Sequence, residues 1–268
     1  MKKHLPLTLA TALFGAAALN VSAQEASVAD YRAMLGGESP GELWAEEGEA
    51  LWKQKNGPKN VSLETCDLGK GPGVLKGAYV ELPRYFKDTD KVMDLEARLK
   101  HCMVTIQGQD PKAIDKAAFS SPGKYIESDM EKIVSYVAMQ SNGLTFNIQT
   151  NHAKEKAAYE AGEALFWRRS GTMDFSCATC HAEDGKRIRL QTLYNAYNEK
   201  DSHATIGSWP TYRVSQSTVR TMQHRMWDCH WQMRLPDIDY ASDAATALIM
   251  FMTKNANGGE LNVPAIKR

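Results

Sequence analysis

Cys177-Ala178-Thr179-Cys180-His181 is the stretch of this 268-residue sequence that says most about its fold. Two thiols separated by two residues and followed directly by a histidine form the attachment pattern of a c-type haem. The thiols can form thioethers to the two vinyl groups, and His181 is then placed to ligate the iron. A redox Cys-x-x-Cys or half of a zinc site are the alternatives, but no second Cys-x-x-Cys or paired histidine follows. The motif therefore predicts one covalently attached haem c, with a sixth iron ligand still to be found.

The first 23 residues predict a secretory signal peptide. Lys2 and Lys3 precede an apolar run over residues 5–19, and Val21-Ser22-Ala23 ends it in the small-x-small pattern of a cleavage site. The run is too short to cross a bilayer, which takes ~20 apolar residues, and no later segment approaches that length. Because c-type haem is attached outside the cytoplasm in bacteria, export to the periplasm agrees with the haem motif. We expect no membrane span in the mature protein.

Charge and length narrow the possible functions. The chain has 32 basic and 32 acidic residues, so no overall positive field suggests nucleic-acid binding. An anionic ligand would have to be bound by positively charged side chains close to its site. The mature chain is longer than one haem-binding domain requires, and two domains are expected. Residues 24–43 are small and polar and predict an extended N-terminal lead-in.

Hydrophobic periodicity predicts a mainly α-helical fold. Strand-like alternation is scarce, and helical spacing recurs through both halves of the chain. The positions that carry this spacing are Trp44, Ala50, Leu51 and Trp52, then Val92, Leu95, Leu99 and Met103, then Ile133, Val137 and Met139, and the segments 157–167, 218–227 and 244–252.

An internal repeat relates the two halves of the chain. Gly48-Glu49-Ala50-Leu51-Trp52 resembles Gly162-Glu163-Ala164-Leu165-Phe166, and a cysteine follows each of these glycines after the same 18 positions. Later, an arginine lies four residues before Cys102 in the first half and four before Cys229 in the second. Each half then closes on Asn-Gly. We therefore expect two cytochrome-c-like domains, over 44–152 and 153–268.

Only the second domain has the residues that a c-type haem needs. Laid over the haem motif, the first half has Leu63 in place of the first thiol and Asp67 in place of the histidine. Cys66 lies at the position of the second thiol, and if Cys66 and Cys102 inherit positions that once faced each other across a haem pocket, loss of that haem leaves them close enough to bridge. We expect them to form a disulfide in an oxidising compartment, worth ~3–4 kcal/mol by the chain-entropy estimate. Two free buried thiols are the alternative.

Cys229, the remaining cysteine, is a candidate for the sixth iron ligand. It is the odd one among five cysteines, and it lies 48 residues after His181, where small cytochrome domains usually present the distal ligand. Thiolate ligation would lower the reduction potential of the haem relative to methionine. Methionine is the usual distal ligand, and the open alternatives are Met222, Met226, Met233, Met250 and Met252.

Arg225 lies one helical turn before Cys229 and therefore on the same helix face. A guanidinium there would lower the pKa of the thiol and offer a bidentate fork to an oxyanion. The alternative role for Arg225 is an ion pair with a haem propionate or a surface acid. His224 is less well aligned with Cys229 and is only a possible second substrate contact. Lys186 and Arg187 are further cations that could add positive charge around the pocket.

The sequence resembles the SoxA subunits of the SoxAX cytochromes of thiosulfate oxidation, which are L-cysteine S-thiosulfotransferases. The resemblance covers essentially the whole mature chain. It rests on the haem motif, on Arg225 four residues before Cys229, and on the degenerate first half that ends at Cys102. Family members carry two haems or only the C-terminal one. With Leu63 and Asp67 at the first haem position, this sequence is similar to the single-haem type.

The resemblance implies a role for Cys229 beyond iron ligation. Cys229 would be found as a persulfide, accept the sulfur unit of thiosulfate and pass it to a carrier-protein cysteine, with two electrons removed, while Arg225 holds the sulfonate end. The implied partners are a SoxX-like cytochrome c subunit, a SoxYZ-like sulfur carrier and a small soluble cytochrome c that accepts the electrons. A plain periplasmic electron-transfer cytochrome c, in which Cys229 only tunes the haem, is the alternative function. A third alternative is a peroxidase or oxygen-binding cytochrome with an open sixth iron position.

Overall fold

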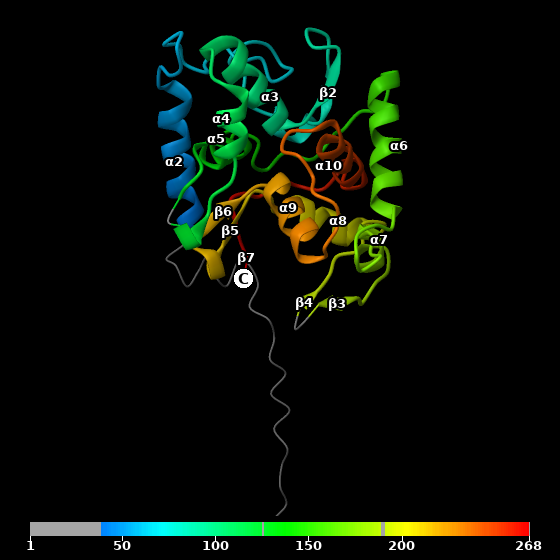
Figure 1. Ribbon diagram of the computed structural model, residues 1–268. Helices are drawn as coiled ribbons and strands as arrows, with labels where there is room; N and C mark the ends of the chain where they lie inside the picture. Colours follow the sequence, from blue (N-terminus) through cyan, green and yellow to red (C-terminus); the bar gives the residue numbers. More distant parts are fainter. Residues whose placement is uncertain (1–38, 125, 189–190, 268) are drawn as a thin grey trace, which may run out of the picture.

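The computed structural model describes residues 39–124, 126–188 and 191–267 (Figure 1). The predicted signal peptide and residues 24–38 of the predicted lead-in lie outside these ranges. Within them the chain is mainly helical, as predicted, and its few strands form three small sheets. None of the helices in the described ranges combines the length and the apolar character needed to cross a membrane.

The first half of the chain, residues 39–152, begins and ends in the helices α2 and α5, which pack against each other. Between them, β1 and β2 form an antiparallel pair. The elements of this half are α2 (Pro40–Lys53), the 3-10 helix η1 (Tyr79–Glu81), β1 (Arg84–Phe86), β2 (Lys91–Met93), α3 (Leu95–Cys102), the π-helix η2 (Met103–Gln107), α4 (Pro111–Lys116), the 3-10 helix η3 (Pro122–Lys124) and α5 (Asp129–Met139).

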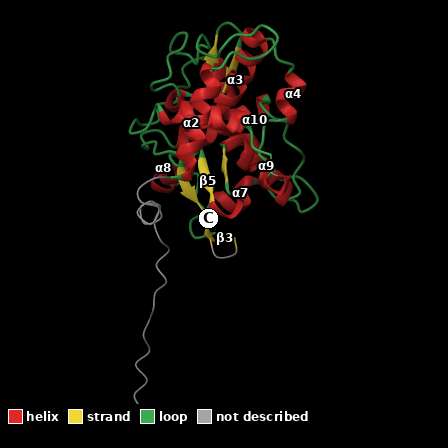
Figure 2. Cartoon of the chain, turned by 90° about the vertical axis from the view of Figure 1, so that its left-hand side faces the viewer, coloured by secondary structure: helices red, strands yellow, loops and turns green. Residues whose placement is uncertain are grey.

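The second half, residues 153–267, adds a small sheet to its helices. Its elements are α6 (Ala153–Trp167), α7 (Cys177–His181), β3 (Arg187–Ile188), β4 (Gln191–Thr192), α8 (Glu199–Ile206), β5 (Thr211–Arg213), the 3-10 helix η4 (Val214–Gln216), β6 (Thr218–Arg220), α9 (Met222–Gln232), α10 (Asp243–Asn255) and β7 (Ala265–Lys267). Strand β5 lies in the middle of the sheet, antiparallel to β6 and parallel to the C-terminal β7. Figure 2 shows β5 below α2 and α10, with α8 on one side and α7 on the other.

In each half the first and last helices cross at a glycine. α2 crosses α5 where a Cβ atom on Gly48 would come within 2.0 Å of the carbonyl oxygen of Lys132. α6 crosses α10 in the same manner, with 1.9 Å between a Cβ built on Gly162 and the carbonyl oxygen of Ala247. No side chain fits at such distances, so both crossings require glycine. These are the two glycines with which the sequence repeat begins.

The helix α2 begins earlier than periodicity predicted. It starts at Pro40 instead of near residue 44, so residues 40–43 are helical and not part of an extended lead-in. The local reason lies in Ser39, whose hydroxyl accepts a hydrogen bond from the N–H of Gly41. A serine cap followed by proline in the first turn is a strong start signal for a helix.

Two other predicted helices begin later, because a short strand precedes each of them. Val92 lies in β2, and the Asp94 side chain caps α3 by accepting from Ala97 N at 2.9 Å. Thr218 likewise lies in β6, and Thr221 caps α9. In both places a capping residue separates the strand from the helix. The spacing of apolar residues does not reveal such a cap, so periodicity placed the helix start too early.

The two halves share packing and backbone hydrogen bonds. Val80 and Ala138 of the first half belong to the buried apolar cluster of the second half. The segment after α5 also runs antiparallel to the segment after α10, with Thr145 opposite Glu260. Around that bridge, Gly143 N donates to the carbonyl of Leu261 at 2.9 Å. Both segments follow the Asn-Gly pairs that close the two repeats.

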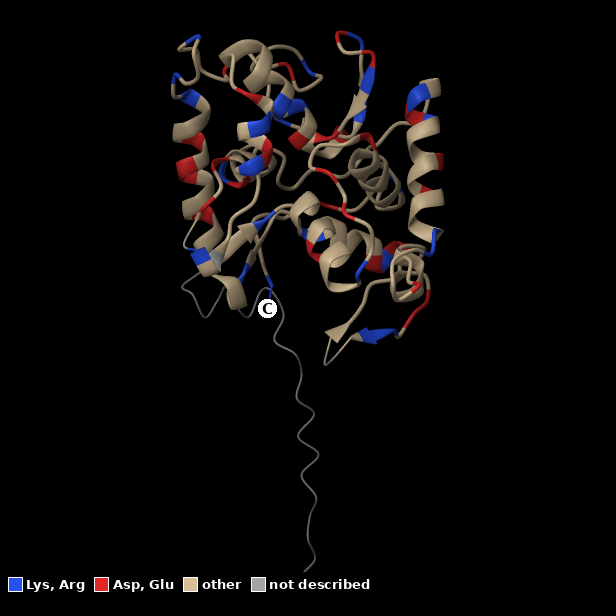
Figure 3. Ribbon diagram, in the orientation of Figure 1, with Lys and Arg blue, Asp and Glu red and all other residues tan. Residues whose placement is uncertain are grey.

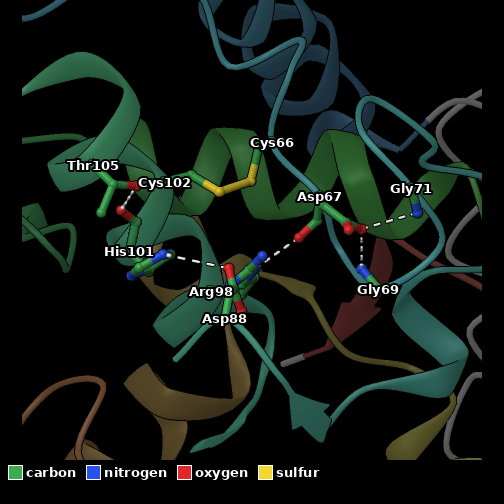
Figure 4. Close-up of a disulfide and its surroundings, with 9 residues drawn as sticks. All are labelled: Cys66, Asp67, Gly69, Gly71, Asp88, Arg98, His101, Cys102 and Thr105. Carbon is green, nitrogen blue, oxygen red and sulfur yellow. Dashed lines mark hydrogen bonds and ion pairs between the residues drawn. A yellow bond between two sulfur atoms is a disulfide. The ribbon is translucent and has the colours of Figure 1, made fainter. Parts of the chain in front are cut away.

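A disulfide joins Cys66 to Cys102 in the core of the first half (Figure 4). Leu63, at the repeat position of the first haem thiol, is buried in the same apolar cluster as both cysteines.

The polar residues beside the disulfide bond to one another. Arg98, one turn before Cys102, is buried; its Nε donates to the carbonyl of Asp67 at 2.7 Å, and its guanidinium pairs with Asp88 at 2.8 Å. The Asp67 carboxylate accepts hydrogen bonds from the N–H groups of Gly69 and Gly71 (Figure 4). Asp67 and Arg98 lie at the repeat positions of His181 and Arg225. Both form hydrogen bonds or ion pairs with other residues of the first half.

Candidate functional site

The residues predicted to hold a haem meet at one cavity of about 480 Å³ in the second half of the chain. This volume lies in the range of small-molecule and cofactor sites. Most of the wall is apolar and includes Phe166, Trp209 and Leu248. The predicted site residues that line the cavity are Cys177, Cys180, His181, Arg225 and Cys229.

The short helix α7 presents the haem motif to the cavity. Ser176 and Thr179 form a reciprocal cap at its start: Thr179 N donates to the Ser176 hydroxyl at 3.2 Å, and Ser176 N donates to the Thr179 hydroxyl at 3.0 Å. This box satisfies backbone donors that the helix leaves free. Cys177 and Cys180 are free, half-buried thiols. Burial and the nearby Cys229 raise the pKa of Cys177 to about 11.

The ring of His181 is oriented by a backbone carbonyl. Its Nδ1 lies 2.9 Å from the carbonyl oxygen of Tyr194. A carbonyl only accepts hydrogen bonds, so Nδ1 of the neutral ring carries the proton and Nε2 keeps its lone pair. Burial lowers the pKa of His181, which favours that neutral ring. Neutral imidazole with a free nitrogen is the form that ligates iron.

Helix α9 brings Arg225 and Cys229 to the same cavity. Its Asp228 forms an ion pair with Arg220 of β6, which ties the helix to the sheet. Burial raises the pKa of the Cys229 thiol, and the guanidinium of Arg225 acts in the opposite direction. Arg225 thus lowers the pKa of the thiol as expected from the sequence, but the net shift is upward because desolvation of the thiolate outweighs the arginine.

The donor set in the cavity fits a c-type haem. Two free thiols one turn apart are available for thioether bonds, and the imidazole of His181 has a free Nε2. A third free thiol, Cys229, faces the same space from another helix. Four of the five candidate methionines also line the cavity, whereas Met250 is buried in the apolar core; the four are Met222, Met226, Met233 and Met252.

His224 does not line the cavity, so the possible substrate contact predicted for it is wrong. The side chain is 1% exposed and turns toward the first half of the chain. Its Nδ1 lies 2.5 Å from a carboxylate oxygen of Glu131 in α5, and its ring stacks on Phe119 with the ring centroids 4.5 Å apart. Five helical positions separate His224 from Cys229, and that rotation places the two side chains on different faces of α9.

Lys186 and Arg187 also lie outside the cavity lining. Lys186 is exposed and pairs with Glu183 at 2.9 Å, and Arg187 belongs to the exposed strand β3. Two cations that the sequence analysis did not single out line the cavity instead, Arg213 at the end of β5 and Lys267 in β7. Neither belongs to a sequence pattern that would mark it as a site residue. Only the register of the sheet brings them to the site.

Comparison with known proteins places both halves of the chain. A family model described as the SoxA/TsdA cytochrome c domain matches residues 47–146, which is the half without a haem motif. A SoxA subunit of L-cysteine S-thiosulfotransferase from Hydrogenophilus thermoluteolus is 49% identical over 244 residues, covering 90% of this chain and 88% of that protein. A protein of the same name from Hydrogenobacter thermophilus is 36% identical over 226 residues, covering 84% and 83%.

Among solved structures, SoxXA from P. pantotrophus contains a chain of similar fold. The TM-score is 0.69 at 24% sequence identity, and the match covers 86% of this chain and 79% of that one.

Proposed function

The chain belongs to the SoxA family, and we propose that it is the SoxA subunit of an L-cysteine S-thiosulfotransferase that joins thiosulfate to a carrier cysteine through Cys229. The observation that carries this proposal is the single cavity in which the haem motif, Arg225 and Cys229 meet. Related proteins of 49% and 36% identity that bear this activity in their names support it.

One haem c belongs in the second half. Cys177 and Cys180 would hold it through thioether bonds, His181 would ligate the iron through Nε2, and Cys229 would be the distal ligand. When bound, the haem supplies a metal that keeps the distal sulfur deprotonated and a centre through which electrons leave. A single haem is favoured because the first half has Leu63 in place of one thiol and Cys66 in a disulfide.

Arg225 would bind and orient thiosulfate. Its guanidinium lines the cavity, and no acidic side chain of the described ranges forms an ion pair with it. Guanidinium binds oxyanions through parallel N–H donors, so the sulfonate end of thiosulfate would rest on Arg225 and the outer sulfur would point toward Cys229. Holding the two sulfur atoms in reach lowers the entropic part of the barrier.

The reaction then has two steps. In the persulfide form of Cys229, the outer persulfide sulfur forms an S–S bond with the outer sulfur of thiosulfate, and two electrons leave to two molecules of oxidised cytochrome c. The thiolate of the carrier cysteine next attacks the former outer sulfur of thiosulfate. A new S–S bond forms to the carrier, the bond to the Cys229 persulfide breaks, and the persulfide returns to its starting anionic state.

The partners follow from this reaction. A SoxX-like cytochrome c subunit would pair with the chain, since the similar solved structure is a SoxXA complex. A SoxYZ-like carrier would bring the acceptor cysteine, and a small soluble cytochrome c would take the electrons. All of these belong in the periplasm, to which the predicted signal peptide would direct the chain.

The two halves would be two cytochrome-c-like domains, with the boundary near residue 152. Support comes from the helix crossings at Gly48 and Gly162, which lie at matching positions of the repeat. The match of a cytochrome c family model to residues 47–146 supports the same view of the haem-less half.

Mass spectrometry of the purified, haem-loaded protein tests the proposed function. The peptide that carries Cys229 should bear an additional sulfur, or a thiosulfonate after incubation with thiosulfate and oxidised cytochrome c. A plain electron-transfer cytochrome would carry neither modification. Cys229→Met should retain haem and lower the rate of thiosulfate-dependent transfer to the carrier, whereas Met173→Leu, on the exposed surface, should not. An undiminished rate in Cys229→Met would disprove the covalent role.

A further inference from the structure

Three cationic side chains line the haem cavity without an acidic partner. They are Arg213, Arg225 and Lys267. Within the described ranges, none of the three forms an ion pair with an aspartate or glutamate or a side-chain hydrogen bond. The acid in the electrostatic surroundings of Arg213 is Asp228, and that carboxylate is engaged by Arg220.

The sheet places two of these cations side by side. Arg213 and Lys267 are register partners on the parallel strands β5 and β7, so their side chains emerge next to each other on one face of the sheet. The Nζ atom of Lys267 also lies 5.4 Å from the ring centroid of Trp209, which lines the same cavity. Figure 3 shows basic positions on the strands beside the C-terminus.

The positive charges of Arg213, Arg225 and Lys267 repel one another on a partly desolvated wall of the cavity. Burial, and next the charges of Arg213 and Arg225, lower the pKa of Lys267 to about 8. The pKa of Arg213 is lowered as well, by burial first and then by Arg225 and Arg220. Uncompensated charges of one sign at a low-dielectric wall are costly, and an anion bound among them would offset that cost.

We propose that Arg213 and Lys267, together with Arg225, form an anion-binding site on the wall of the haem cavity, which takes a carboxylate or sulfonate group. Two molecules can bring such a group to this place. One is the haem, through a propionate, and the other is thiosulfate, through its sulfonate end. The second source rests on the proposed function, and the first rests only on the presence of haem.

Neutral variants of the two new residues test the site in the haem-loaded full chain. Lys267→Met keeps the apolar stem of the side chain, and Arg213→Gln keeps a polar side chain at the end of β5. The matched control is Lys186→Met, which removes one positive charge from the same half at an exposed position outside the cavity lining. Lys267→Arg retains the charge and should behave as the unmodified protein.

Two measurements separate the sources of the anion. Calorimetric titration with thiosulfate, without carrier protein, gives the dissociation constant, and spectroelectrochemical titration gives the midpoint potential of the haem. If the sulfonate is held here, each neutral variant should raise the thiosulfate dissociation constant at least tenfold with an unchanged potential. If a propionate is held here, the potential should shift and the haem content fall, with unchanged thiosulfate affinity. Changes in both would assign both anions to the site.

The proposal is overturned if both quantities in Lys267→Met and Arg213→Gln equal those of Lys186→Met. It is also overturned if Lys267→Arg is as impaired as Lys267→Met, because charge would then be irrelevant. Should Arg213→Gln fail to fold, the Lys267 pair still decides, since Lys267 lies in the last strand. The titrations involve no sulfur transfer, so they are independent of the mass-spectrometric test of Cys229.

Discussion

Nδ1 of His224 and a carboxylate oxygen of Glu131 lie 2.5 Å apart, across the boundary between the two halves of the chain. Both side chains are buried, with exposed fractions of 1% and 0%. The second Glu131 oxygen accepts from Ser120 N at 3.0 Å, so the carboxylate is bonded on both sides. The pair fixes the first turn of α9, the helix that carries Cys229, to the first half of the chain.

Glu131→Ala should destabilise the protein strongly, because it leaves the buried imidazole of His224 without its partner. Removing one member of a buried ion pair costs about 3–5 kcal/mol, and leaving a buried hydrogen-bonding group without a partner costs about 1–3 kcal/mol. Urea denaturation of the haem-loaded protein measures this loss. Glu127→Ala is the matched control: it removes an exposed acid that pairs with Lys132 at 2.7 Å, and Lys132 keeps its second partner Glu47 at 2.5 Å, so the loss should be smaller. Equal losses in the two variants would contradict the importance of the pair.

Glu96 should make the stability fall as pH rises. Burial, and next the charge of Asp94, raise the pKa of Glu96 well above its ordinary value of 4.5. In the unfolded chain Glu96 loses its proton near the ordinary value, whereas the folded protein retains it, so the folded state binds more protons over the interval between the two pKa values. The free energy of unfolding therefore decreases with rising pH across that interval, by up to about 1.4 kcal/mol per pH unit for one proton.

Glu96→Gln should flatten this dependence and preserve the bond with the Thr221 hydroxyl, which donates to Glu96 at 3.0 Å. Denaturation midpoints measured at several pH values above 4.5 provide the comparison. Asp94, whose pKa is also raised by burial, should leave a residual slope. Identical slopes in the variant and the unmodified chain would show that Glu96 does not retain a proton on folding.

Gly162→Ala should weaken both the fold and the retention of haem. The added methyl group would meet the carbonyl of Ala247, so α6 and α10 would have to move apart. Overpacking of this kind costs typically ~1–3 kcal/mol, and more against a backbone atom that cannot yield. Phe166, on the same helix, lines the haem cavity, so the displacement should reach it. Haem content per protein and thermal unfolding are the measurements. Gly123→Ala, where nothing lies within 4 Å of the new Cβ, should change neither.

Replacing both Cys66 and Cys102 by alanine should lower the free energy of unfolding by about 3–4 kcal/mol, the chain-entropy value for a loop of this length. The haem spectrum should be unaffected, because the disulfide lies in the core of the first half and does not line the haem cavity. Thiol counting before and after reduction checks the bond in the unmodified protein. Two reactive thiols without reduction would refute it.

The parts of the site that could be predicted from sequence are those fixed by spacing along one helix. The haem motif occupies the five residues of α7, and Arg225 and Cys229 are one turn apart on α9. Helix geometry alone places such residues on one face. Gly48 and Gly162 were recognisable from the repeat for a similar reason, since each sits inside a regular apolar pattern.

The parts that could not be predicted depend on contacts between distant segments. The spacing on α9 separates His224 from Cys229, but it does not reveal that Glu131, 93 positions earlier, is the partner of His224. Arg213 and Lys267 meet through strands of only three residues, which are too short to show alternation. For the same reason the strand at Thr218 looked like the start of a helix.

The antiparallel backbone pairing between residues 143–146 and 258–261 makes each half of the chain depend on the other. Deletion of the first half would leave residues 258–261 without the backbone segment they pair with, and α9 without its anchor at Glu131. The first half therefore acts as a scaffold for the second, and an exchange of either half with that of a relative should succeed only when both halves are exchanged together.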